Sequence, residues 1–171
     1  EEIIPILCVG EDKTKRQENL QLQVIMEELK MAMKNLSMEE QKKVIIAYEP
    51  IWSIGTGIIP TNNQIEEVIN AIKKLYPENQ VLYGGSANEE NIDELKKISC
   101  IDGYLIGGLS LKPEKLKIFL EKLGFKAYNT GCPTIWGLTP DLCAKISNTK
   151  STSVVFTLTS YQPDQIRDKA M

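Results

Sequence analysis

Apolar and polar positions along the first 123 residues follow two alternating patterns. Short continuous apolar runs are typical of strands buried on both faces, and they occur at residues 3–9, 44–48, 81–83 and 102–106. After each run, apolar residues recur at every third or fourth position, which predicts amphipathic helices over about 14–36, 61–75, 89–98 and 113–123. This alternation predicts parallel strands joined by helical crossovers, an α/β fold of four β/α units.

Local signals indicate where the helices begin and end. Thr61 and Gln64 have the spacing of a capping box, in which each side chain bonds the backbone at the other residue. Pro77 ends that helix, and Pro113 suits the first turn of the last one. Ser37 predicts a capped turn before the second strand. We expect the second helix to bury Ile65, Val68, Ile69, Ile72 and Leu75.

The second strand ends at an acidic residue. Glu49 follows the apolar run directly, and Pro50 stops the strand because it has no N–H to donate. A loop with Gly55 and Gly57 comes next. Because α/β folds carry catalytic groups at the carboxyl ends of parallel strands, Glu49 is a candidate catalytic carboxylate. The alternative is a solvated loop glutamate.

Two glycine pairs follow the third and fourth strands. Gly84-Gly85 and Gly107-Gly108 each precede a predicted helix. Without Cβ atoms, backbone N–H groups approach a phosphate closely, and a helix N-terminus adds favourable partial charge. One such pair is common in tight turns. Two pairs after consecutive strands favour a phosphate site, because barrel enzymes often bind phosphate after their last two strands.

Composition and charge limit the classes of partner and ligand that we expect the chain to bind. The 171 residues carry a formal charge of −3 and no long basic run, so we expect no binding to nucleic acid or to a membrane. There is no histidine, which removes most zinc sites and the commonest general acid, and we expect neither a metal nor a cofactor. The four cysteines form no C-x-x-C pair and read as reduced, mostly buried residues of a cytoplasmic protein.

Four stretches carry a family resemblance: ILCVGE, AYEPIWSIGTG, LYGGSAN with NIDEL, and IDGYLIGGLSLKP. In this order they resemble triosephosphate isomerase over residues 3–123, which implies one half of its eight-stranded TIM barrel. The resemblance implies that the glutamate of AYEP, Glu49, is the base that interconverts dihydroxyacetone phosphate and glyceraldehyde 3-phosphate in glycolysis and gluconeogenesis. It also implies phosphate contacts at Gly55, Ser86, Gly107 and Gly108, with Leu105 near this small phosphorylated triose.

The sequence departs from the family pattern in three ways. The family's first four β/α units, with their substrate-binding lysine and electrophilic histidine, have no counterpart in the sequence. Ser53 stands where alanine is common, and residues 58–60 replace a smaller, more polar hinge. The sequence does not begin with Met and is interpreted as a fragment or processed product. We therefore expect it to be inactive alone, and either to pair with an N-terminal half barrel or to self-associate.

From about Gly124 the pattern changes. Residues 124–171 predict a short α/β C-terminal segment with a helix starting near Pro140 and a strand over 154–159. NTGCPTIWGLTPDLCA followed by VVFTLTSY resembles part of the polysaccharide pyruvyl transferases. Two alternatives to an isomerase fragment therefore stay open. One is a non-enzymatic, phosphate-binding half barrel, and the other is a remnant of a pyruvyl transferase.

Overall fold

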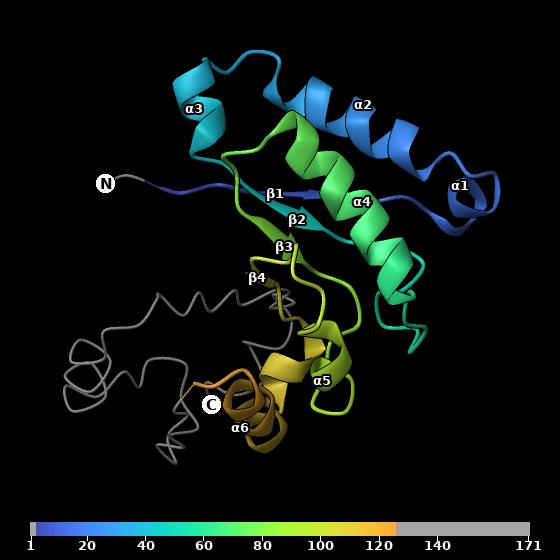
Figure 1. The fold of residues 1–171 in the computed structure, drawn as a ribbon, viewed down its shortest axis with the longest axis vertical. Helices are drawn as coiled ribbons and strands as arrows, with labels where there is room; N and C mark the ends of the chain where they lie inside the picture. The colour runs from blue at the N-terminus through green and yellow to red at the C-terminus, as the bar shows by residue number, and fades with distance from the viewer. Residues whose placement is uncertain (1–2, 126–171) are drawn as a thin grey trace, which may run out of the picture.

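The sheet has four parallel strands in the order of the sequence (Figure 1). A computed structural model describes residues 3–125. The strands are β1 (Ile6–Val9), β2 (Ile45–Tyr48), β3 (Val81–Tyr83) and β4 (Gly103–Tyr104). Because Val9 pairs with Tyr48 and Tyr48 with Tyr83, the strands end level with one another. Their carboxyl ends therefore meet along one edge.

Helices connect successive strands, which confirms the predicted α/β fold of four β/α units, as in one half of a TIM barrel. They are α1 (Lys13–Gln17), α2 (Gln21–Met33), α3 (Met38–Lys42), α4 (Asn62–Leu75), α5 (Ile92–Leu95), the 3₁₀ helix η1 (Gly108–Leu111) and α6 (Pro113–Lys122). The predicted C-terminal segment and its resemblance to pyruvyl transferases lie outside the described residues.

The helix ends follow the local signals. The capping box of Thr61 and Gln64 is confirmed, with the Gln64 N–H 3.3 Å from the Thr61 hydroxyl and the Thr61 N–H 2.9 Å from the Gln64 side chain. Ser37 forms the same motif with Glu40, and what was predicted as a capped turn is the short helix α3. Pro113 is the first residue of α6. These ends are set by neighbours in the sequence, which is why the sequence predicts them.

Three predicted elements are shorter or divided. The single helix expected over 14–36 is broken into α1 and α2 at Asn19, whose φ of 56° is left-handed. The helix expected over 89–98 contracts to α5, because Asn88 and Asn91 bond each other's backbone N–H groups instead of continuing a helix. The fourth strand keeps only two of its five predicted residues.

The core lies between the sheet and the helices that cover one of its faces. Helices α2 and α4 lie side by side on this face (Figure 1). Four of the five residues predicted for the α4 stripe are fully buried, whereas Leu75 is 59% exposed at the last turn. Tyr48 and Tyr83 pack with ring centroids 6.4 Å apart, and Tyr104 meets Phe119 of α6 edge to face. The aromatic residues thus extend the core across three strands.

The opposite face of the sheet is less covered. Side chains alternate between faces along a strand, so Ile6 and Cys8 point away from the face that Leu7 and Val9 share with the core. Ile6 is half-buried and Cys8 is exposed, which corrects the expectation of a buried cysteine. Cys100 is half-buried, and the other two cysteines lie outside the described residues.

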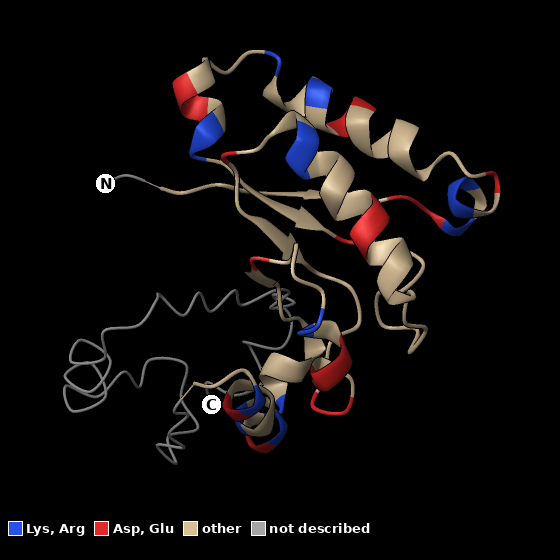
Figure 2. Cartoon of the chain, viewed as in Figure 1, with Lys and Arg blue, Asp and Glu red and all other residues tan. Residues whose placement is uncertain are grey.

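Charged residues lie on the helices and loops, with both signs mixed, whereas the four strands carry none (Figure 2). None of the helices described in residues 3–125 is long and apolar enough to cross a membrane.

Asn79 offers a test of this packing. Its buried side-chain amide donates to the carbonyl oxygens of Gln41 and Val44, each at 2.7 Å. These bonds link the segments that lead into β2 and β3. We expect Asn79→Ala to lower the free energy of unfolding, measured in urea, by about 1–3 kcal/mol because buried acceptors lose their donor. Asn63→Ala on the exposed side of α4 should change it by less than about 0.5 kcal/mol. Equal losses in the two variants would contradict this role.

Candidate functional site

Glu49 lies at the carboxyl end of β2, between the ends of its two neighbours. Its backbone N–H donates to the Val9 carbonyl at 2.8 Å, and the preceding Tyr48 carbonyl accepts from the Gly84 N–H at 2.8 Å. The residue is half-buried. Its side chain is therefore held at the edge where the β1, β2 and β3 ends meet.

Two glycines make room for this glutamate. A Cβ atom on Gly10 would lie 1.8 Å from the Glu49 carbonyl oxygen, and one on Gly84 would lie 2.6 Å from Glu49 Cγ and 3.1 Å from its Oε1. The distances of 1.8 Å and 2.6 Å are far below contact distance, so no larger residue fits at either position without moving Glu49. The carboxyl group thus lies directly against Gly84. Sequence reasoning treated Gly84 as part of a candidate phosphate-binding glycine pair, not as a neighbour of Glu49, and missed Gly10.

The surroundings of Glu49 make it more basic than an exposed glutamate. Burial raises the pKa of its carboxyl group, and a hydrogen bond from the Cys8 thiol opposes this only in part. Burial and the nearby Glu49 charge in turn raise the pKa of Cys8. The thiol therefore stays protonated and acts as the donor.

A hollow of about 310 Å³ lies beside the strand ends. Its lining consists of Ile54, Gly55, Gly84, Gly85, Ser86, Ala87, Asn88, Glu89, Glu90, Ile106, Gly107, Gly108, Leu109, Lys112 and Lys115. Gly55, Ser86, Gly107 and Gly108, which the resemblance assigned to phosphate, are thus brought together. Glu49 is not part of the lining but touches Gly84, which is.

Leu105 behaves differently from the other predicted substrate contacts. It is 9% exposed, does not line the hollow, and donates its backbone N–H to the Tyr83 carbonyl at 3.0 Å. The next residue, Ile106, lines the hollow instead. Leu105 is therefore a buried residue whose backbone bonds the end of β3, and it is not one of the residues that line the hollow.

Two lysines at the hollow were missed by sequence reasoning. Lys112 and Lys115 both line it, and Lys115 bonds the Glu89 side chain across the hollow. Their side-chain cations attract anions. The signal was present in the sequence, since LKPEK begins two residues after the second glycine pair. Among residues 3–125, no group of three or more His, Cys, Asp or Glu converges as a metal site.

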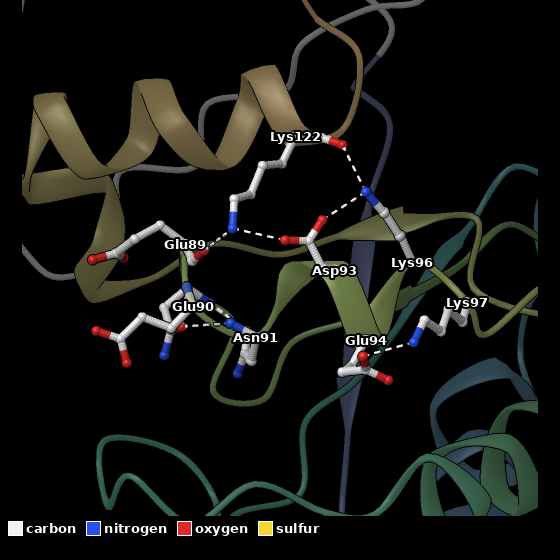
Figure 3. Close-up of polar contacts among 9 residues, drawn as sticks. Glu89, Glu90, Asn91, Asp93, Glu94, Lys96, Lys97 and Lys122 are labelled. Atoms are coloured by element: carbon white, nitrogen blue, oxygen red, sulfur yellow. Dashed lines mark hydrogen bonds and ion pairs between the residues drawn. The ribbon is translucent and has the colours of Figure 1, made fainter.

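An ion pair between Lys122 and Asp93 connects α6 to α5, and Lys96 pairs with the same carboxylate (Figure 3). The Lys122 ammonium donates to Asp93 at 2.7 Å and to the Glu89 carbonyl at 2.8 Å, and Lys96 bonds the other Asp93 oxygen at 2.6 Å. Lys122 and then Lys96 lower the pKa of Asp93 to about 2. Exposed pairs contribute little stability singly. Together they join α5 and the Glu89 backbone to the end of α6.

Glu11 anchors the loop that follows Glu49. This fully buried carboxylate accepts from the Trp52 indole N–H at 2.9 Å and from the Tyr48 hydroxyl at 3.2 Å. Burial raises the pKa of Tyr48, so its hydroxyl remains a donor. The Ser86 hydroxyl donates to the Ser53 carbonyl at 2.6 Å, which holds the same loop against the hollow. Sequence reasoning missed the role of Glu11, because its partners lie 37 and 41 residues away.

The raised pKa of Glu49 gives a pH-dependent prediction. A carboxyl whose pKa is higher in the folded than in the unfolded state costs stability as pH rises from the unfolded value, about 4.3, through the folded one. We expect Glu49→Gln, which removes this cost, to melt at a higher temperature than the unaltered chain at pH 7. The difference should vanish below the unfolded pKa. Glu27→Gln on the exposed side of α2 is the control, and a lower melting temperature for Glu49→Gln at pH 7 would contradict burial of the charge.

Comparison with known proteins assigns the family. The family model described as Triosephosphate isomerase matches residues 1–123. Proteins named triosephosphate isomerase are 41% identical in Emericella nidulans (69% of this chain, 51% of that protein), 45% in Mycoplasmopsis agalactiae (67% and 43%) and 44% in Acetivibrio thermocellus (63% and 47%). The chain spans about half the length of these curated relatives. On this similarity and on its parallel half-barrel fold, the chain belongs to the triosephosphate isomerase family.

Proposed function

We propose that this chain carries the proton-transferring half of an active site that interconverts dihydroxyacetone phosphate and glyceraldehyde 3-phosphate. The observation that carries the proposal is the contact between Glu49 and Gly84, because it joins a basic carboxylate to a hollow lined by glycine turns and lysines. The relatives, which are named triosephosphate isomerase, support the same reaction.

In this mechanism Glu49 acts as a general base. It removes a proton from the carbon beside the substrate carbonyl and returns it to the neighbouring carbon, and its raised pKa favours the first transfer. Backbone N–H groups of Gly55, Ser86, Gly107 and Gly108 hold the phosphate. The loop over residues 51–58 covers the substrate and excludes water. Phosphate binding thereby contributes to the rate of a reaction at a distant carbon.

The proposed site needs groups that the 171 residues do not contain. The sequence has no histidine, so a histidine electrophile would come from outside it. Oriented donors of this kind account for about 3–4 kcal/mol of barrier lowering, which is two to three orders of magnitude in rate. We therefore propose that the isolated chain is nearly inactive.

We propose that the second half of the site comes from another set of four β/α units. Within residues 3–125, β1 and β4 each pair with one strand only, so both outer edges of this sheet are open to a partner strand. Half-buried Ile6 and exposed Cys8 lie on the face that a closed barrel would enclose. The relatives are about twice as long as the matched region, which is the length such a complement requires.

Complementation tests this proposal. The chain would be mixed with the first half of the Acetivibrio thermocellus relative, and complex formation and isomerase turnover would be measured together. We expect a one-to-one complex whose turnover exceeds that of the Glu49→Gln complex by about a hundredfold or more, as for loss of a general base. The isolated chain should not exceed its Glu49→Gln variant.

The outcomes separate the two leading functions. A complex with equal turnover for the unaltered chain and Glu49→Gln would contradict the catalytic role. A discrete homodimer that binds phosphate but does not bind the first half of the relative would instead favour a non-enzymatic half barrel closed by a second copy.

A further inference from the structure

The charged side chains that line the hollow are balanced in sign. Lys112 and Lys115 are cations, and Glu89 and Glu90 are anions. Because the formal charge of the lining is zero, net charge alone draws no anion into the hollow. What an anion meets there depends on how these four charges are paired.

Lys115 is paired with Glu89. Its ammonium donates to a Glu89 carboxylate oxygen and so connects α6 to the segment that precedes α5, 26 positions earlier in the sequence. This hydrogen bond is the main cause that lowers the pKa of Glu89, to which the charge of Lys112 adds less. The same bond raises the pKa of Lys115. Glu89 thus acts as an internal anion that already occupies this lysine.

The two partners differ in their freedom to move. The Glu89 backbone carbonyl accepts from the Lys122 ammonium at 2.8 Å, and Lys122 also donates to Asp93 at 2.7 Å (Figure 3). Only 14% of the Glu89 side chain is exposed, against 49% of the Lys115 side chain. Because a lysine ammonium lies at the end of a flexible stem, it can turn to a new partner. Lys115 is therefore the member of the pair that moves, and Glu89 the member that stays.

We propose that Lys115 is a side-chain ligand for the anion in the hollow and that Glu89 competes with the anion for it. This rests on the proposed function, because it requires an anion in the hollow. When the anion binds, the Lys115 ammonium leaves the Glu89 carboxylate for an oxygen of the anion. Breaking the first ion pair lowers the affinity for the anion, and forming the second raises it. Two side chains outside the glycine pairs thus set how tightly the anion is held.

A double-mutant cycle with sulfate tests this exchange. Isothermal titration calorimetry on full-length chains, at fixed ionic strength, gives the sulfate dissociation constant without a change in screening. We expect Glu89→Gln to tighten sulfate binding by about twofold or more, because both a competitor and a like charge are removed. Lys115→Gln should weaken sulfate binding, because a cationic ligand is lost.

The coupling between the two substitutions separates exchange from simple attraction between charges. If Lys115 leaves Glu89 on binding, Lys115→Gln costs more affinity in the Glu89→Gln background, where no ion pair has to be broken. We expect the loss there to be about twofold to fivefold larger than in the unaltered chain, the factor that corresponds to breaking an exposed ion pair. Attraction without exchange gives equal losses in the two backgrounds.

Lys117→Gln and Glu121→Gln provide the matched control. These residues form an ion pair at 3.4 Å on the same helix, α6, and neither lines the hollow. The control cycle makes the same changes in charge, so it should alter the sulfate dissociation constant by less than about 1.5-fold and show no coupling. Coupling of equal size in the control pair would contradict the exchange.

The remaining outcomes also support or contradict the role of Lys115. Equal losses in the two backgrounds, or no effect of Lys115→Gln in either, would overturn that role and leave the proposed function standing. A smaller loss in the Glu89→Gln background would overturn it too, because Glu89 would then assist the lysine. If no chain of the cycle binds sulfate, the proposed anion site and the exchange fail together.

Discussion

The close approach of two glycines to Glu49 is the constraint on which the site depends. Gly10 on one side leaves space for the glutamate backbone, and Gly84 on the other leaves space for its side chain. Level strand ends bring these residues to one edge, and burial there raises the pKa of Glu49. The same Gly84 lines the hollow beside the lysines. The fold, the raised pKa of Glu49 and the proposed anion site thus depend on the same contact.

Three sets of contacts hold the segments at this edge of the sheet in place. Glu11 holds the loop through Trp52, Ser86 holds it through Ser53, and the Asp93–Lys122 pair joins the elements behind the two glycine turns. These bonds are spread over residues far apart in the sequence. They join the glycine turns and the loop in a single arrangement, beside the sheet face that the proposed second half would cover.

Sequence reasoning succeeded where the deciding forces are local. The Thr61 capping box and the α4 stripe follow from residues a few positions apart, and the strands follow from apolar runs. It failed at Asn19, because helical periodicity continues across a residue whose backbone turns left-handed. It also missed Glu11 and Lys115, whose roles come from partners brought near only by the fold. The place of Glu49 at a strand end made it a candidate from the residues alone, whereas its role as a base and the role of Ser86 came from family resemblance.

The central claim is that Glu49 and the glycine turns form one site, and the carboxyl carbon signal of Glu49 tests it most directly. The measurement is its 13C titration with and without saturating sulfate, an anion whose charge is constant over that range, with Glu49→Gln used for assignment. We predict a pKa above that of an exposed glutamate, and a further rise with sulfate because the anion in the hollow is then separated from the Glu49 carboxylate only by Gly84. A Glu49 pKa unchanged by bound sulfate would contradict the account.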